Sequence, residues 1–152
     1  MQRRSHAAAR ESFDAYRLAA SRGELTGELD PAALPRLADR VTGEGGQVRW
    51  SIRGDADAEG RPAIVVAIEG AVPLTCQRCL GVVVEPVAQS TLLLLARDEA
   101  ELVRLDEASE HEVVPAGAPL DPVALVEDEL LLTLPFAPRH EGECAPVAGA
   151  SA

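Results

Sequence analysis

Four residues of metal-binding type occur in two close pairs. Cys76 and Cys79 are separated by two residues, and His140 and Cys144 are separated by three. The two pairs contain all three cysteines of the chain, and residues 80–139 lie between them. Zinc favours four thiolate or imidazole ligands in a tetrahedron, and two ligands from one turn can reach the same ion. The spacing therefore predicts a Cys3His zinc site.

Two other interpretations of the cysteines stay open at this point. They could be small buried apolar residues, with Cys144 in a C-terminal tail. Cys76 and Cys79 could also serve as a thiol-based redox pair or metal sensor, as a C-x-x-C sequence does in thioredoxin-like proteins. That motif needs a helix that begins at the first cysteine. Gly81 and a run of three valines follow instead, which favours a turn or strand.

Five charged residues are candidates for contacts with a partner. Glu127, Asp128 and Glu129 are consecutive in a predicted helix, where successive side chains point about 100° apart. We expect them not to converge on one ion and to form a charged outer face, which the basic surface of a partner could contact. Arg78 lies between the first two cysteines, and Arg139 precedes the histidine of the predicted site.

Sequence motifs of catalysis are missing from the chain. No Ser-His-Asp order, G-x-S-x-G, Walker loop or G-x-G-x-x-G occurs. We therefore expect a binding protein, with no enzymatic activity and no small-molecule substrate.

The elements that must position these residues are strands in the middle of the chain. Val48, Trp50 and Ile52 alternate with polar residues, which indicates a half-buried strand. Residues 54–61 look like a hairpin connection, and Gly70 is expected at a bulge or turn. Further strand segments are expected at residues 64–68, 72–76, 82–84 and 91–95. Such short, closely spaced segments predict an antiparallel sheet or small β-barrel within residues 46–96.

Helices are predicted near both ends of the chain, so the expected fold class is α+β. Residues 10–20 have helical apolar spacing, and Asp30-Pro31 indicates a second helix that runs to about residue 41. The acid-rich residues 97–112 predict a surface loop or short helix. Asp121-Pro122 begins another helix, which has an apolar stripe formed by Val123, Val126, Leu130 and Leu134.

Length and composition favour one soluble domain. The 152 residues are 47% hydrophobic, and we expect a single domain at 1–144 with a flexible tail at 145–152. The longest apolar run is far shorter than the ~20 residues of a membrane-spanning helix, so no membrane partner is expected. The first ten residues lack the apolar segment of a secretory signal. We therefore expect a cytoplasmic protein with reduced thiols.

Charge is unevenly distributed along the chain. The net charge is −11; residues 1–53 hold nine arginines and seven acidic residues, and residues 54–152 hold five arginines and eighteen acidic residues. Such an acidic chain is a poor electrostatic partner for RNA. The charge favours basic proteins as partners, or an RNA contact confined to the N-terminal part.

Two stretches resemble one family. Residues 69–80, EGAVPLTCQRCL, and residues 121–144, DPVALVEDELLLTLPFAPRHEGEC, are similar to the YceD family of large ribosomal RNA subunit accumulation proteins. The resemblance implies a role in the synthesis, processing or stability of large-subunit ribosomal RNA, and it implies no reaction. The implied partners are the precursor of that RNA or its proteins, contacted directly or through a basic protein. The matching signature positions are Cys76, Arg78, Cys79, Glu127, Asp128, Glu129, Pro135, His140 and Cys144.

Overall fold

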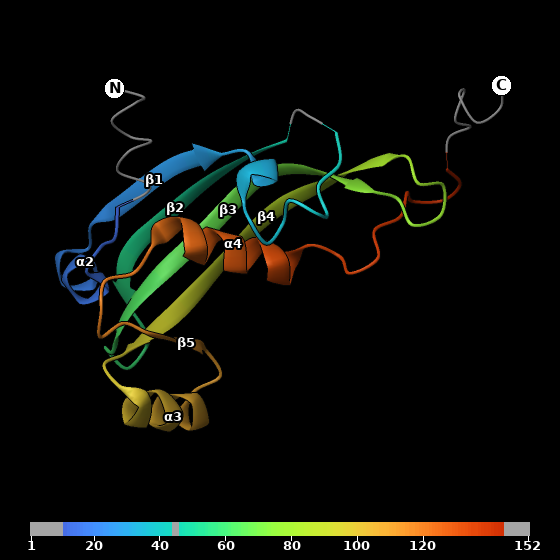
Figure 1. The fold of residues 1–152 in the computed structure, drawn as a ribbon. Helices are drawn as coiled ribbons and strands as arrows, with labels where there is room; N and C mark the ends of the chain where they lie inside the picture. Colours follow the sequence, from blue (N-terminus) through green and yellow to red (C-terminus); the bar gives the residue numbers. More distant parts are fainter. Residues whose placement is uncertain (1–10, 44–45, 145–152) are drawn as a thin grey trace, which may run out of the picture.

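The backbone forms one five-stranded open sheet with strand order β1-β2-β3-β4-β5 (Figure 1). The computed structural model describes residues 11–43 and 46–144. The first four strands are antiparallel, and β5 joins β4 in parallel. The strands are β1 (Glu24–Leu29), β2 (Gln47–Ala56), β3 (Pro62–Thr75), β4 (Val82–Ala96) and β5 (Glu112–Pro115). The predicted α+β class is confirmed, and the sheet is open rather than closed into a barrel.

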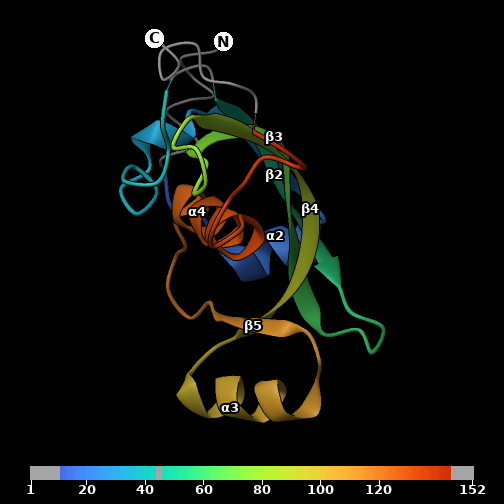
Figure 2. The same ribbon diagram turned by 90° about the vertical axis from the view of Figure 1, so that its right-hand side faces the viewer.

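Helices α2 and α4 lie on the same side of the curved sheet, whereas α3 projects away beyond β5 (Figure 2). The helical elements are α2 (Ala15–Ser21), the 3-10 helix η1 (Pro31–Ala33), α3 (Glu99–Ala108) and α4 (Pro122–Thr133). Asp14, Asp98 and Asp121 each cap the N-terminus of a helix by accepting a hydrogen bond from a backbone N–H of its first turn. The Asp-Pro signal at residues 121–122 is thus confirmed as a helix start.

The core lies between the inner face of the sheet and α4. Trp50 and Ile52 of β2 are buried there, as the alternating sequence predicted. From α4, Val126 and Leu130 are fully buried against the sheet, and Leu134 follows just after the helix end. Burying a large aliphatic side chain stabilises a fold by about 1.5–3 kcal/mol, so this stripe fixes the position of α4 on the sheet.

The helix expected from Asp30 to about residue 41 does not form. Only η1 is helical, and turns follow it. The reason is Pro35, which has no N–H and disfavours the helical conformation of the residue before it. Leu34 is accordingly extended, with ψ of 126°.

Other differences from the sequence prediction concern strands. β1 and β5 were not predicted, and the segments at 82–84 and 91–95 belong to the single strand β4. The acid-rich stretch contains α3, a surface helix with no buried residue, which is one of the two alternatives expected there. Gly70 lies inside β3 and pairs in register with both Val48 and Val87, so it marks no bulge or turn. Pro86 is tolerated because β4 has no neighbour on its other side at this point within the described residues.

Close packing of α2 on the sheet requires glycine at residue 54. A Cβ atom there would overlap the backbone carbonyl of Leu18, and the Gly54 N–H donates to the Gly23 carbonyl at 2.8 Å. We expect Gly54→Ala to lower the free energy of unfolding by about 2 kcal/mol because the helix must shift. Gly60→Ala should cost only about 1 kcal/mol, since its φ of 82° is strained but the surrounding space is open. Equal losses in urea unfolding would contradict this explanation.

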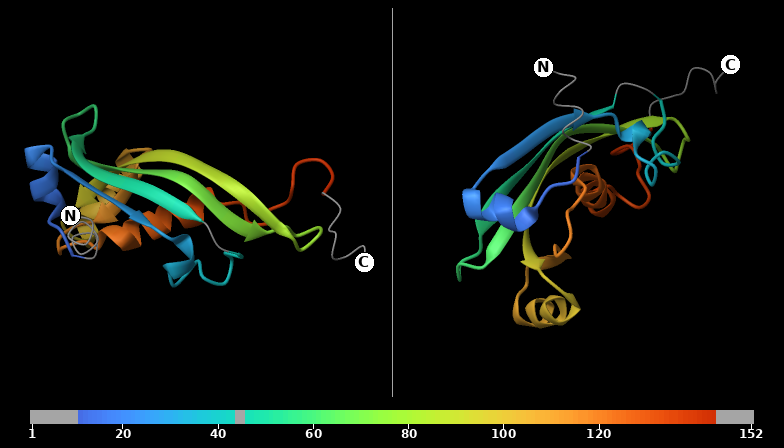
Figure 3. Two further views of the ribbon diagram at one scale, coloured as in Figure 1. Left: turned by 90° about the horizontal axis from the view of Figure 1, so that it is seen from above. Right: turned by 60° about the vertical axis from the view of Figure 1, so that its left-hand side comes forward.

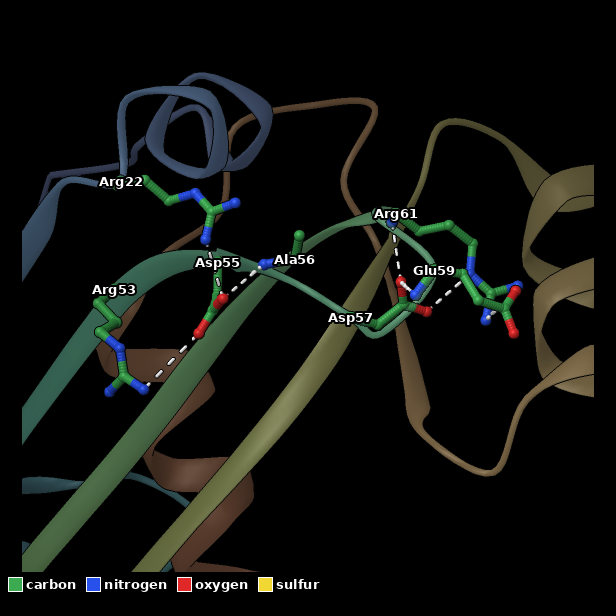
Figure 4. A network of polar contacts seen from close by, with 7 residues as sticks. All are labelled: Arg22, Arg53, Asp55, Ala56, Asp57, Glu59 and Arg61. Atoms are coloured by element: carbon green, nitrogen blue, oxygen red, sulfur yellow. Dashed lines mark hydrogen bonds and ion pairs between the residues drawn. The ribbon is translucent and has the colours of Figure 1, made fainter.

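The β2–β3 connection is organised by one carboxylate (Figure 4). Oδ1 of Asp57 accepts backbone N–H groups of Glu59 and Arg61, and Oδ2 accepts Nε of Arg61 at 2.7 Å. Burial opposes ionisation of Asp57, but these hydrogen bonds outweigh it and hold the pKa of the carboxyl below its ordinary value. Arg22 and Arg53 similarly contact Asp55 at the end of β2.

The depressed pKa of Asp57 makes the stability of the fold depend on pH. Ionised Asp57 stabilises the folded state fully above the ordinary carboxyl pKa of about 4, and this contribution is lost as pH falls through the lower pKa of the folded state. We expect Asp57→Asn to destabilise the protein at neutral pH and the gap to wild type to shrink below about pH 4. Urea unfolding at a series of pH values measures it. Glu59→Gln, at a side chain 72% exposed, should show no comparable gap.

A candidate metal centre at the tip of the β3–β4 hairpin

The β3–β4 hairpin is the longest in the sheet, and the segment after α4 runs back to its tip (Figure 3). This arrangement brings together Cys76, Cys79, His140 and Cys144, the four residues that the sequence singled out for zinc. Their ligand atoms all lie within 4.8 Å of one another. Cys76 is buried and the other three are half-buried. Two pairs that are far apart in sequence are therefore adjacent in space.

Distances within the cluster fit a tetrahedral ion. The sulfurs of Cys76 and Cys144 are 3.7 Å apart, and Cys79 Sγ is 3.6 Å from His140 Nδ1. In a tetrahedron with zinc–sulfur bonds of about 2.3 Å and zinc–nitrogen bonds of about 2.0 Å, two sulfurs would be about 3.8 Å apart, and a sulfur and a nitrogen about 3.5 Å apart. All three cysteines are free thiols. The residues present fit zinc in donor type, number and spacing.

A tight backbone turn orients the first two cysteines. The N–H of Cys76 donates to the carbonyl of Gly81, and the N–H of Leu80 donates to the carbonyl of Cys76, both at 2.8 Å. The N–H groups of Arg78 and Gly81 point at the sulfurs of Cys76 and Cys79, at 3.4 Å each. This is a turn between two strands, with no helix at the first cysteine. The structure thus lacks the context of a thioredoxin-like pair.

Three further hydrogen bonds hold the second ligand pair against this turn. Gln77 N–H donates to the carbonyl of Pro138 at 2.8 Å, and the guanidinium of Arg78 donates to the carbonyl of Gly142 at 2.7 Å. His140 Nε2 lies 2.9 Å from the carbonyl oxygen of Val82. A carbonyl can only accept, so Nε2 carries a proton in this contact, and Nδ1 is the ring nitrogen that faces Cys79. Such an orienting bond on the far nitrogen is typical of metal-bound histidine.

Thiol acidity in the cluster is uneven. Burial opposes ionisation of Cys76, but contacts from the backbone N–H groups of Cys79, His140 and Arg78 outweigh it and lower the pKa of this thiol to about 5. Burial, together with the neighbouring sulfurs of Cys79 and Cys76, raises the pKa of Cys144 to about 11. Ionised thiols this close to one another repel each other. A divalent cation between them would neutralise their negative charges.

The acidic residues of α4 are not the outer face that their sequence predicted. Glu127 and Glu129 are each only 5% exposed, and Asp128 alone of the three is exposed. Glu127 accepts the backbone N–H of Arg36 at 2.7 Å and its Nε at 3.1 Å, while Asp128 accepts Nη2 of the same arginine at 2.6 Å. Glu127 and Asp128 thus do converge on one cation, because a guanidinium presents several N–H donors.

Arg36 and Thr91 are the polar partners that sequence reasoning missed. Arg36 follows η1, and Thr91 Oγ1 of β4 donates to Glu129 Oε1 at 2.8 Å. No local pattern connects either residue to α4, because the contacts span 91 and 38 positions of the chain. Arg139, the remaining candidate for partner contacts, is exposed and adjoins His140 of the candidate metal cluster.

The sequence model of one family, the large ribosomal RNA subunit accumulation protein YceD, matches residues 64–151. The chain belongs to the YceD family. The match covers more than half of the chain, so the family resemblance of the two sequence stretches is confirmed. It begins within β3 and includes all four candidate metal ligands. The YceD description names the accumulation of large-subunit ribosomal RNA and states no reaction.

No solved structure matches this YceD family member. Within residues 11–43 and 46–144, no helix combines the length and hydrophobicity that a membrane crossing requires.

Proposed function

We propose that this chain is a non-catalytic binding factor that supports the synthesis, processing or stability of large-subunit ribosomal RNA in the cytoplasm. Membership of the YceD family is the observation that carries this proposal. The factor would act through contacts with the precursor RNA or its proteins. Arg78, Arg139, Asp128 and Glu129 are candidates for these contacts, whereas Glu127 is buried and paired with Arg36.

The metal centre supports a binding role rather than catalysis. A catalytic zinc keeps one position for water or substrate, whereas a structural zinc is enclosed by four protein ligands. Three thiolates and one imidazole would complete the tetrahedron here, so the proposed zinc is structural. Its effect would be to fasten the segment after α4 to the tip of the β3–β4 hairpin and so present both as one rigid surface.

Charge favours a protein as the direct partner. Residues 54–152 hold eighteen acidic residues against five arginines. Phosphate groups of RNA would be repelled by such a surface, whereas basic proteins that bind RNA would be attracted to it. The proposed route to the RNA is therefore through a basic protein.

The experiment is to deplete the protein from cells, measure large and small subunits on a sucrose gradient, and recover the tagged protein with and without ribonuclease. We expect large subunits to fall relative to small ones, and a basic protein to stay bound after ribonuclease. An unchanged subunit ratio would refute the proposed role. Release of all bound material by ribonuclease would instead show that the contact depends on RNA.

A further inference from the structure

A groove opens between α4, β4 and β5 on the side of the sheet that α4 covers. Its volume is about 450 Å³, within the range of sites that take a side chain or a small ligand. The side chains that line it include two carboxylates and no basic residue. These side chains are Gln89, Thr91, Glu112, Glu129, Leu132 and Thr133.

Glu129 is the deepest charged group of this groove. It is only 5% exposed, and its Oε1 accepts one hydrogen bond, from Thr91 Oγ1 at 2.8 Å. No arginine or other donor contacts its Oε2 within the part of the chain that the structure describes. Burial raises the pKa of this carboxyl, as do the nearby Glu112 and Asp128. A buried carboxylate without a cation is costly, and a cation from outside would relieve that cost.

Glu127, two positions earlier on α4, is a buried carboxylate whose hydrogen bonds are made within the chain. Both of its oxygens accept donors of Arg36. Glu127 therefore belongs to an ion pair within the chain, whereas Glu129 still has one oxygen that can accept a donor. Of the two buried glutamates of α4, Glu129 is therefore the one placed to bind a partner.

The groove lies next to an unpaired strand edge. β5 pairs with β4 only over Leu93–Ala96, so no described strand pairs with residues 82–92 of β4 on that side. Pro86 blocks part of this edge, and residues 87–92 continue to the groove, where Gln89 and Thr91 line its wall. An extended segment of another protein can pair with such an edge while its side chains enter adjacent pockets.

We propose that this groove receives an arginine or lysine side chain of a basic protein segment that lies along the open edge of β4. The inference rests on the proposed function, in which the partner is a basic protein associated with the large-subunit precursor. The cation would reach Glu129, with Glu112 at the rim, and Leu132, which is 69% exposed, would cover the aliphatic part of the incoming side chain.

The test is a titration of the full-length protein with an acetylated, amidated hexa-arginine peptide, followed by calorimetry and by NMR of the backbone amides. Glu129→Gln should weaken binding about tenfold, and Glu112→Gln by a smaller factor because this residue is exposed. Glu24→Gln removes the same charge from the exposed face of β1, at the opposite edge of the sheet, and should change affinity less than about twofold. Amide shifts should centre on β4 and the end of α4.

Three results would overturn the proposal. The first is equal weakening by all three variants, which would mean diffuse attraction to an acidic surface. The second is a set of amide shifts that avoids the groove. The third is an RNA oligonucleotide that shifts the groove amides when the peptide does not. Circular dichroism checks whether the Glu129→Gln variant is folded. If that variant is unfolded, the test rests on Glu112→Gln, which changes an exposed residue.

The proposed function and the groove can fail separately. A subunit ratio that falls on depletion, together with peptide binding independent of Glu129 and Glu112, would retain the ribosomal role and reject the groove. Peptide binding that depends on Glu129 in a protein whose depletion leaves the subunit ratio unchanged would retain the groove and reject the ribosomal role.

Discussion

The purified protein is expected to contain about one zinc ion per chain, and Cys76→Ser to contain none. Removing the metal should lower the free energy of unfolding by about 4 kcal/mol when zinc is present at about 1,000 times its dissociation constant. In a chain of this size that corresponds to a fall in melting temperature of about 8–16 °C. The sheet should remain folded, because Cys76 lies at one end of the core and most of the core, around Trp50, Ile52 and α4, does not depend on the cluster, while residues 135–144 detach from the hairpin tip. Metal analysis and thermal unfolding measure the two effects.

Two comparisons separate a metal ligand from a merely buried residue. Cys76→Val keeps the site apolar and similar in volume, so it would cost little if Cys76 were only a small hydrophobic residue of the core. As a ligand, its loss should cost as much as Cys76→Ser. His140→Ala should likewise remove zinc, whereas His111→Ala, at an exposed histidine outside the cluster, should leave the zinc content unchanged. A stable, zinc-free Cys76→Val protein would show that no structural metal is needed.

Arg36→Ala is expected to destabilise the fold by about 2 kcal/mol. The change leaves Glu127, whose side chain is 6% exposed, with only a backbone N–H as its donor. Breaking a fully buried ion pair costs about 3–5 kcal/mol, and the loss is smaller here because the side chain of Arg36 is 50% exposed and water screens the pair. Urea unfolding at neutral pH measures the loss.

Arg49→Ala is the matched control for Arg36→Ala. Arg49 forms an ion pair of 2.8 Å with Glu69, but the side chains of both residues are more than 60% exposed. Its removal should change stability by less than about 1 kcal/mol. Equal losses for the two arginines would mean that burial of Glu127 adds nothing, and would contradict the role assigned to Arg36.

Local signals in the sequence were sufficient for several parts of this protein. The Asp121-Pro122 cap and the apolar stripe of α4 identified that helix, since capping and helical periodicity depend on residues within a few positions of one another. The alternation in β2 identified its buried face for the same reason. The four candidate ligands were also recognisable, because residue type and short spacing already restrict the chemistry of a zinc site.

Long-range contacts decided the rest. Strands β1 and β5 are short and depend on pairing with β2 and β4, so little in their own residues marked them as strands. The burial of Glu127 and Glu129 depended on Arg36 and Thr91, which approach α4 only in the folded chain. An acidic run is usually solvated. Its burial is costly in free energy unless a partner from elsewhere in the chain supplies hydrogen bonds or a positive charge.

The sequence by itself determined which residues can bind a metal and which segments can form a helix or a strand, because these properties depend on side-chain chemistry and local periodicity. Only the tertiary structure decided that a hairpin tip and the segment after α4 meet, that Glu127 is neutralised within the chain, and that Glu129 faces a groove. Each of these depends on contacts between residues that lie 38–91 positions apart, whose formation is governed by the packing of α4 on the sheet.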